Sequence, residues 1–373
     1  MSVLELALQR NKYKHLSDEE WRWFLQQTEG RERTADKLPT FAATEDWWYP
    51  VRLSCEQCSS ELAARYKASL VSGEKAADLT GGYGVDTYFL SAHFAHMDYV
   101  ELNAELCRIA AHNFADKPIS IHNTSAEDFL KNAGRYDLIY LDPARRNSHG
   151  GKVFRLEDCT PNVVDLLPDL QAYSQRIMLK LSPMLDLAQA VKALSSAAWD
   201  IYVVAIKNEV KEILLLSGGS GRITAIDLEK KDQVFVFTRE EEQKSTLNSQ
   251  FSILNSQLSI LNSPFSTLHY LYEPNVAILK AGAYKLIAER FGLCKLDVNT
   301  HLYSAEKYVE DFPGRVWRII EHQEISHANV LTRNYPLTPD QLKKKLHLRD
   351  GGDVYVIGCR VAGKPTLFYA ERV

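Results

Sequence analysis

The sequence predicts an α/β fold built on a mainly parallel sheet, with a helical region before it and a small α+β domain after it. Between residues 71 and 217, short apolar runs alternate with helical stretches, which is typical of a parallel sheet with helices on both faces. The last two runs, IYVVAI and EILLLS, are separated only by KNEVK, which is too short for a crossover helix. We therefore expect these two strands to form an antiparallel hairpin.

The chain of 373 residues is long enough for two or three domains. The patterns along it predict four segments: a helical region at 1–70, the sheet domain at 71–238, a low-complexity insertion at 239–268 and an α+β domain at 269–373.

The helical region is predicted from apolar residues at helical spacing, such as Leu4 and Leu8. In LSDEEWRWFL, Ser17 followed by acidic residues marks a helix N-terminus, and ELAARYKASL (61–70) predicts another helix. We expect the aromatic stretch EDWWYP (45–50) to pack against the following domain rather than to stack on a nucleobase.

The sheet domain contains five apolar runs before the hairpin, and two further strand candidates, RITAIDL and VFVFTR, extend it to residue 238. The next segment changes composition abruptly, with a seven-residue repeat (LNSQFSI, LNSQLSI, LNSPFST) at 247–267. Its Ser and Asn content is poor for a helix interior, so we interpret it as a repeat expansion in a loop.

The C-terminal segment is predicted to begin with one helix in EPNVAILKAGAYKLIAERFGL (273–293). RVWRIIE, NVLTRNY and the closing DVYVIGCRVAGKPTLFYAERV predict strands, the last a hairpin that turns at Ala362-Gly363-Lys364. Between them, TPDQLKKKLHL predicts a helix with Thr338 as its cap and Pro339 in its first turn.

A net charge of −4 excludes a uniformly basic nucleic-acid binder, but the sheet domain is acidic and the C-terminal domain mildly basic. The six cysteines are scattered, and the CxxC of Cys55 and Cys58 has no second ligand pair, so we expect reduced thiols and no metal. No apolar run is long enough to cross a bilayer and the N-terminus shows no cleavage signature, which predicts a cytoplasmic protein without membrane contact. The oligomeric state is left open.

The first candidate site motif is the glycine loop in ADLTGGYGVDTYFL. Asp78 ends a strand, and Gly81, Gly82 and Gly84 allow a tight turn into the next helix. The loop departs from the dinucleotide fingerprint, because Asp86 at the helix start would repel a diphosphate. A cofactor with a cationic amino-acid end tolerates this acid, so the loop, Thr80 included, favours S-adenosylmethionine (SAM).

Acidic residues follow the next two strands. Glu101, with Asn103 close by, lies about twenty residues beyond the loop, where an acid accepts hydrogen bonds from ribose hydroxyls. After the third strand, Glu127 or Asp128 is a candidate acceptor for the adenine amino group, with Ala126 offering its backbone. A helix N-terminus also favours two acids there, so both interpretations stay open.

Taken in order, DLTGGYGVD, VELN, SAED and LIYLDPAR resemble the motifs of the class I SAM-dependent methyltransferases over about residues 55–238. The resemblance implies a Rossmann-like methyltransferase sheet and a cofactor site lined by Asp78, Gly81, Gly82, Gly84, Glu101, Asp128 and Asp142. The C-terminal region resembles the ferredoxin-like and THUMP-like tail of a bacterial subset of these enzymes. The chain also resembles that subset in its motifs EQCSS, LKLSPMLD, NEVKE and FPGR. That tail implies RNA binding.

Within this resemblance, YDLIYLDPARR (136–146) is the motif that faces the transferred methyl group. Amino-group methyltransferases present Asp/Asn-Pro-Pro and an aromatic residue, whereas this chain has Asp142 and Pro143 followed by Ala144 and Arg145. We therefore retain Asp142 as hydrogen-bond acceptor or base, and exocyclic-amine methylation is in doubt. Arg145 and Arg146 either hold a phosphate or pair with nearby acids.

Other charged residues lie near the same sheet edge or on the C-terminal domain. Lys180, inside an apolar strand, requires a partner and is expected to pair with Asp142 or to contact substrate. The charged NEVKE turn, which includes Glu212, is expected to be solvated. For phosphate contacts the candidates are Lys343, Lys344, Lys345 and Arg349, with a merely solvated helix face as the alternative.

These observations predict a SAM-dependent methyltransferase (EC 2.1.1.-) acting on structured RNA, either tRNA or rRNA. One alternative keeps the fold with a small-molecule or protein substrate. Another is a non-catalytic RNA-binding protein with a degenerate site.

Overall fold

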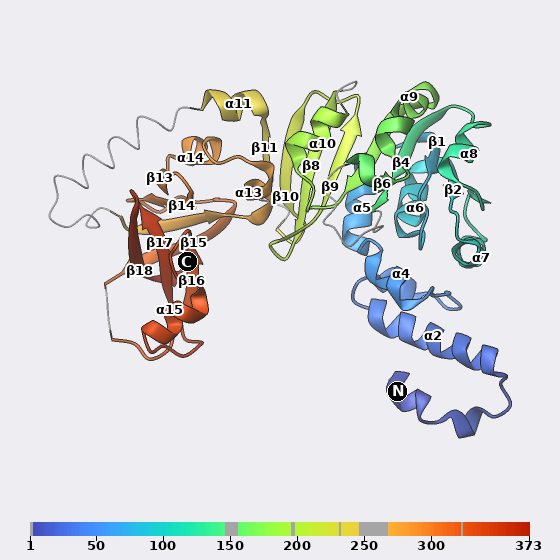
Figure 1. Cartoon of the computed structure of the whole chain (residues 1–373), viewed down its shortest axis with the longest axis horizontal. Helices are drawn as coiled ribbons and strands as arrows, with labels where there is room; N and C mark the ends of the chain where they lie inside the picture. The colour runs from blue at the N-terminus through green and yellow to red at the C-terminus, as the bar shows by residue number, and fades with distance from the viewer. Residues whose placement is uncertain (1–2, 146–155, 195–197, 231–232, 246–267, 322–323) are drawn as a thin grey trace. The chain divides into compact units, whose positions relative to one another are not determined.

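The computed structural model describes residues 3–145, 156–194, 198–230, 233–245, 268–321 and 324–373 (Figure 1). They divide into two compact units, residues 1–200 with 212–220, and residues 201–211 with 221–373. No helix in these ranges is both long and apolar enough to cross a membrane. Residues 246–267, which hold the predicted repeat, lie outside the described ranges; the helix α11 (Arg239–Lys244) precedes them.

The N-terminal region is helical, as predicted. Ser17 begins α2 with a capping box, in which its hydroxyl accepts from the Glu20 amide at 3.2 Å and its own amide donates to Glu20 at 2.7 Å. The helices of this region are α1 (Val3–Ala7), α2 (Asp18–Thr34), α3 (Pro39–Ala43), α4 (Arg52–Gln57) and α5 (Glu61–Ser69).

The aromatic stretch EDWWYP packs against the glycine loop, as predicted. Trp47 is buried, stacks on Phe41 with ring centroids 4.0 Å apart, and donates its Nε1–H to the Tyr83 hydroxyl at 2.9 Å. The helical region is thereby joined to the sheet by a buried aromatic cluster.

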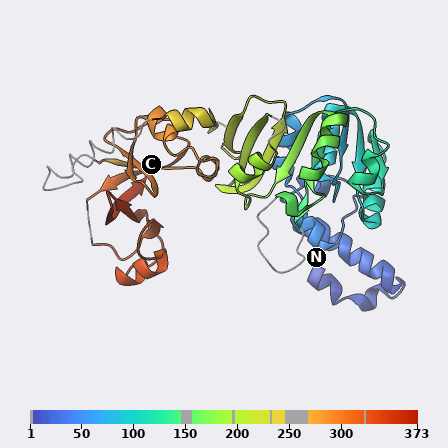
Figure 2. The same cartoon turned by 45° about the horizontal axis from the view of Figure 1, so that its top comes forward.

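The large sheet has nine strands in the order β11-β10-β8-β9-β7-β4-β1-β2-β3. All strands that the sequence predicts for it are present, and they lie side by side (Figure 2). Their bounds are β1 (Gly73–Asp78), β2 (Phe94–Val100), β3 (Ile119–His122), β4 (Tyr136–Leu141), β7 (Ser174–Leu181), β8 (Trp199–Ile206), β9 (Glu209–Ser217), β10 (Arg222–Asp227) and β11 (Phe235–Thr238).

The predicted hairpin is confirmed. β9 runs antiparallel to β7, with Met178 opposite Leu216, and lies between β7 and β8. The turn uses Lys207 and Asn208, both with positive φ, which suits a two-residue hairpin loop. β1, β2, β3, β4 and β7 pair in parallel, so their carboxyl ends share one edge.

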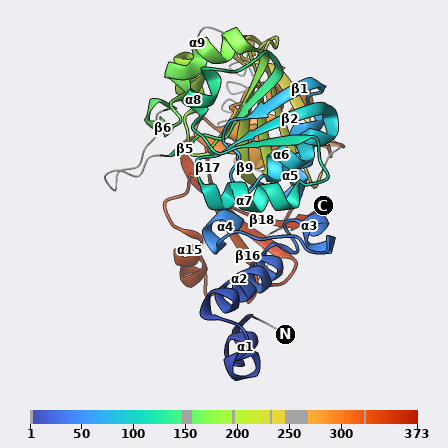
Figure 3. The same ribbon diagram turned by 90° about the vertical axis from the view of Figure 1, so that its right-hand side faces the viewer.

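Helices cover both faces of this sheet. In Figure 3, α8 and α9 lie above the strands, while α5, α6 and α7 lie below them. The crossover helices are α6 (Val85–Leu90), α7 (Ala104–Asn113), α8 (Ala126–Leu130), α9 (Val163–Tyr173) and α10 (Leu187–Ala193). A short antiparallel pair, β5 (Ala144–Arg145) with β6 (Cys159–Thr160), follows β4.

The C-terminal sheet has seven strands in the order β13-β14-β12-β15-β18-β17-β16. The predicted strands and terminal hairpin are confirmed as β15 (Gly314–Ile320), β16 (Asn329–Arg333), β17 (Val354–Val361) and β18 (Lys364–Arg372). Helix α15 (Pro339–Lys345) starts at a Thr338 capping box, also as predicted. A core containing Trp317, Leu271 and Phe368 packs on this sheet.

The prediction of one long helix over residues 273–293 is wrong. Residues Tyr270–Pro274 form β12, and the helix that follows is split into α13 (Val276–Ala281) and α14 (Leu286–Phe291). The split occurs at Gly282, whose φ of 86° ends α13 in the left-handed conformation. Two further short strands, β13 (Cys294–Asp297) and β14 (Thr300–Ala305), were also missed.

Candidate functional site

The glycine loop turns tightly between β1 and α6. Gly82 and Gly84 have positive φ values of 55° and 82°, and a Cβ on Gly81 would collide with the buried ring of Tyr99. The Tyr99 hydroxyl donates to the Gly82 carbonyl at 2.6 Å, and this bond fixes the loop against β2. Each of the three glycines therefore has a steric reason to lack a side chain.

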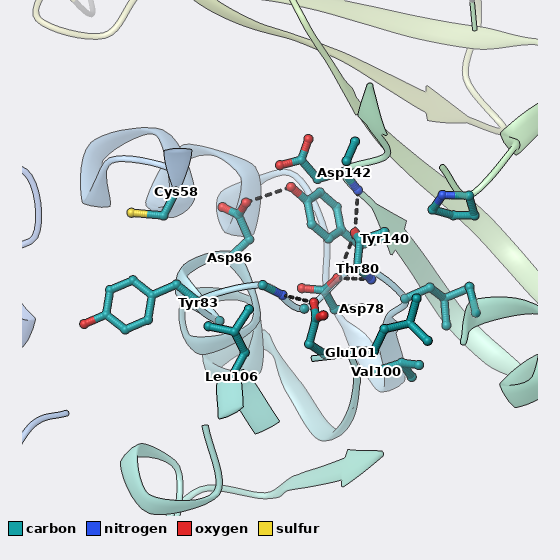
Figure 4. A pocket seen from close by; sticks show the side chains of 18 of the residues that line it. Cys58, Asp78, Thr80, Tyr83, Asp86, Val100, Glu101, Leu106, Tyr140 and Asp142 are labelled. Atoms are coloured by element: carbon teal, nitrogen blue, oxygen red, sulfur yellow. Dashed lines mark hydrogen bonds between the residues drawn. The ribbon is translucent and has the colours of Figure 1, made fainter. Parts of the chain in front are cut away.

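A cavity of about 370 Å³ opens above this loop at the carboxyl ends of β1, β2 and β4 (Figure 4). Its size is suitable for a small-molecule ligand. The sequence-predicted residues that line it are Asp78, Thr80, Gly81, Gly82, Gly84, Asp86, Glu101, Ala126, Glu127 and Asp142. Ten predicted residues from four separate sequence segments are thus brought together.

Asp78 is fully buried at the end of β1. Its Oδ1 accepts from the Thr80 amide at 3.0 Å, and its Oδ2 accepts from the Thr87 hydroxyl at 2.6 Å. Burial outweighs these hydrogen bonds and raises the pKa of Asp78 from 3.8 to about 7.

This pKa predicts a pH dependence of stability. Because the folded-state pKa is raised, Asp78 stabilises the fold below pH 4, and that contribution is lost as the pH rises through about 7. The neutral variant Asp78→Asn escapes this loss. The melting temperature of Asp78→Asn minus that of wild type, both measured by circular dichroism, should therefore be larger at pH 8 than at pH 5. A difference that is the same at both pH values would contradict the prediction.

Glu101 follows β2 and bridges the loop to the next helix. Its Oε2 accepts from the Gly82 amide at 2.9 Å (Figure 4), and its Oε1 accepts from the Asn103 amide at 2.8 Å. Since a carboxylate oxygen has two acceptor positions, both oxygens retain capacity for ligand hydroxyls.

Asp86 lies at the start of α6, where its carboxylate is buried next to a lysine ammonium group of opposite charge. Its Oδ2 accepts from the Tyr140 hydroxyl at 2.7 Å and from the Ser59 hydroxyl at 2.8 Å, and its Oδ1 lies 3.2 Å from the Lys67 Nζ. Burial alone would raise the pKa of Asp86, but the ammonium groups of Lys67 and Lys180 hold it below its ordinary value.

Lys67 also contacts Glu212, and this corrects a prediction. The NEVKE turn was expected to be solvated, but the Glu212 side chain is buried in β9, with both oxygens 2.7 Å from the Lys67 Nζ. A buried carboxylate needs such a partner, and Lys67, 145 residues away in sequence, supplies it.

Asp142 follows β4 at the sheet edge. Its amide donates to the Thr80 hydroxyl at 2.6 Å, and its Oδ2 accepts a hydrogen bond from the Lys180 Nζ, which is the partner expected for that lysine. Although burial lowers the pKa of Lys180, the Asp142 carboxylate raises it above its ordinary value. Pro143 is buried beside this pair.

Two predicted cofactor residues do not line the cavity. Asp128 is mostly exposed on the first turn of α8 and pairs with Lys131 at 2.6 Å. Asn103 caps α7, where its side chain accepts from the amides of Glu105 and Leu106. For Asp128 the helix N-terminus is the alternative that the sequence left open, whereas the capping role of Asn103 was not predicted.

One wall of the cavity was missed by the sequence analysis. Ser54, Gln57, Cys58 and Ser59 reach the cavity from α4 and the α4–α5 connection. Gln57, Cys58 and Ser59 belong to the EQCSS motif, which is the only signal for this wall in the sequence, and Ser54 precedes it. The other unpredicted lining residues are Leu79, Tyr83, Val85, Val100, Leu102, Leu106, Thr124, Tyr140, Ala144, Thr160 and Pro161.

Cys55 and Cys58 are free thiols, and burial raises the pKa of both. In the described parts of the chain, no cluster of three or more His, Cys, Asp or Glu side chains could hold a metal ion.

The predicted phosphate-contacting cations differ in their environments. Lys343 is paired with Asp350 and lies 3.6 Å from Asp340, whereas Lys344, Lys345 and Arg349 are exposed. Arg146 lies outside the described residues, and Arg145 is described only as backbone of β5.

Comparisons with known proteins agree with the fold of both domains. A ferredoxin-like domain model matches residues 270–313 and a THUMP domain-like model matches residues 314–372. A crystal structure of a protein classed as a methyltransferase, from Porphyromonas gingivalis W83, is 31% identical, with a TM-score of 0.84 over 96% of this chain and 92% of that chain. An uncharacterized S-adenosylmethionine-dependent methyltransferase, found in two Mycobacterium tuberculosis strains, is 22% identical over 91% of this chain and 92% of its own.

Proposed function

Since the chain belongs to the class I SAM-dependent methyltransferases with a C-terminal THUMP-like domain, we propose that it methylates a base in structured RNA, either tRNA or rRNA. The observation that carries the proposal is the coexistence of two features in one chain. One is a cavity that gathers the glycine loop, Glu101 and Asp142 at a sheet edge; the other is a THUMP-like domain with exposed cations.

SAM is the cofactor, and we assign its three parts to residues of the cavity. Gly81, where a Cβ would strike Tyr99, lets the loop beside the cavity pack closely against β2. We assign the ribose hydroxyls to Glu101, the cationic amino-acid end to Asp78 and Asp86, and the adenine to Ala126 and Glu127. Each assignment pairs an acceptor, or a small residue, with the matching ligand group.

The cofactor supplies a methyl group bound to a positively charged sulfur, ready for in-line displacement. Among the residues that the structure describes, Lys180 is the one hydrogen-bond donor to the Asp142 carboxylate, and we assign the remaining lone pairs to the N–H or O–H group that is to be methylated. This contact orients the nucleophile's lone pair toward the methyl carbon and takes up its proton where the chemistry requires it. Lys180 positions Asp142.

The THUMP-like domain would hold the RNA backbone. Lys344, Lys345 and Arg349 are exposed around α15 and available to phosphates. Each phosphate contact releases bound counterions, so RNA affinity should fall steeply with salt concentration.

Replacing these cations by neutral residues tests whether they bind the RNA backbone. The triple variant Lys344→Ala, Lys345→Ala, Arg349→Ala should weaken RNA binding and reduce the slope of log affinity against log salt by about 2 to 3. Filter binding at several salt concentrations measures this. Lys343→Ala is the matched control, since its ammonium is already paired with Asp350, and it should change the slope little. An unchanged slope in the triple variant would place the RNA elsewhere.

The acceptor is identified by comparing nucleosides from a strain that lacks the protein with those from the complemented strain. Mass spectrometry of digested tRNA and rRNA should reveal one methylated nucleoside that is absent without the protein. Identical nucleoside profiles would contradict RNA methylation and favour a protein or small-molecule acceptor.

A further inference from the structure

Lys67 is a fully buried lysine that no step above requires. It comes from α5, and its Nζ lies 2.7 Å from both Glu212 oxygens, 3.2 Å from the Ser59 hydroxyl and 3.2 Å from the Asp86 Oδ1. A buried lysine with two carboxylates links three segments far apart in sequence to the cofactor cavity.

Burying three charges is expensive, and apolar residues of similar size often serve stability equally well. Glu212 is the one charged side chain within the buried part of β9, where Ile213, Leu214 and Leu215 follow it. Stability of the sheet alone therefore does not account for an ion pair at this place.

Asp86 is the member of this group of Lys67, Glu212 and Asp86 that lines the cavity. The Asp86 Oδ2 is occupied by Tyr140 and Ser59, but the Oδ1 accepts no hydrogen bond from the described residues and has only the ionic contact with Lys67. A buried carboxylate oxygen with spare acceptor capacity, in a residue that lines a ligand cavity, is suited to a cationic ligand group.

Several charged and titratable groups surround Asp86. They are Lys67 from α5, Glu212 from β9, Tyr140 from β4, Lys180 from β7, Asp142 after β4, Asp78 at the end of β1 and Cys58 before α5. Lys180 is hydrogen-bonded to Asp142, which leaves Lys67 as the nearest counter-charge of Asp86.

We propose that Lys67, held by Glu212, is a positioning residue that keeps Asp86 ionised and oriented toward the cationic amino-acid end of the cofactor. This inference rests on the assignment of Asp86 to the cofactor in the proposed function. It does not depend on the methyl acceptor. Lys67 itself lies behind Asp86 and acts through it.

The test replaces Lys67 and Glu212 together, so that neither is left as an unpaired buried charge. In Lys67→Met with Glu212→Leu, Asp86 loses its counter-charge and burial favours its protonated form. S-adenosylhomocysteine should bind the double variant about tenfold more weakly than wild type at pH 7.5, the effect of one pKa unit. The ratio of the wild-type affinity to that of the double variant should approach one by pH 9.5, because Asp86 of the double variant is ionised there. Isothermal titration calorimetry of both proteins at each pH measures this ratio.

Two further variants separate this role from a purely structural one. Glu212→Gln leaves the Lys67 charge beside Asp86, so it should keep the wild-type pH profile. Arg65→Met on the exposed face of α5 is the matched control and should keep wild-type affinity. In the Asp86→Asn background, the double replacement should add no further loss.

A loss of affinity that is the same at every pH would overturn the proposal, as would unchanged affinity in the double variant. If the double variant does not fold, Lys67→Met with Glu212→Gln replaces it; the same pH-dependent loss supports the proposal, and a pH-independent loss or unchanged affinity overturns it. Because the readout is cofactor binding, failure to find an RNA acceptor leaves this outcome unaffected.

Discussion

Replacing Asp142 by Asn should lower kcat by about 100-fold or more while leaving the affinity for SAM largely intact. The amide has the same shape and its oxygen can still accept from Lys180, so the Thr80 and Lys180 contacts are preserved. The variant loses the negative charge that orients the substrate donor and takes its proton. Single-turnover methyl transfer and SAM titration together separate the two effects.

Asp169→Asn is the matched control, because this carboxylate is exposed on α9 and lies outside the cavity lining. It should transfer methyl groups at the wild-type rate. A collapse of cofactor affinity in Asp142→Asn would show instead that Asp142 is a cofactor ligand, and its catalytic role would be wrong.

The second large effect is expected for Gly81→Ala. The new Cβ would overlap the ring of Tyr99, which is buried between the loop and Phe114 and cannot move without displacing the Gly82 carbonyl. Overpacking of this kind typically costs about 1–3 kcal/mol, and the loop that holds the cofactor is the segment free to yield. We therefore expect SAM affinity to fall by about 10- to 100-fold.

Gly134→Ala provides the comparison, since a Cβ at that position meets no atom within 4 Å. It should bind SAM as wild type does and melt at the same temperature or slightly higher. Wild-type affinity in Gly81→Ala would mean that the loop relaxes without consequence, and that close packing against Tyr99 is not what shapes the cavity.

Local sequence patterns, which extend over a few residues, predicted most of the large sheet. Apolar runs spaced by helical stretches located its strands, and the short KNEVK connection identified the antiparallel hairpin. The same reasoning failed at residues 273–293, where the apolar periodicity continues through Gly282 although the backbone does not. Short strands such as β13, with four residues, carry too little alternation to be recognised.

The site was predicted where it depends on strand ends and missed where it depends on tertiary contacts. Lys180 was conspicuous as a lysine inside an apolar strand, and Asp142 is the partner it needed. Glu212 looked like part of a solvated charge run because its partner Lys67 lies 145 residues away. The α4–α5 wall of the cavity was missed for the same reason: nothing local to EQCSS shows what it faces.

The most direct test of the central claim is transfer of radiolabelled methyl groups from SAM to RNA extracted from a strain that lacks this protein. Purified wild-type protein should label tRNA or rRNA of that strain to a fixed stoichiometry. RNA from the wild-type strain should accept little label, and the Asp142→Asn variant should label neither RNA preparation. Absence of label in RNA, from a protein that demonstrably binds SAM, would contradict RNA methylation.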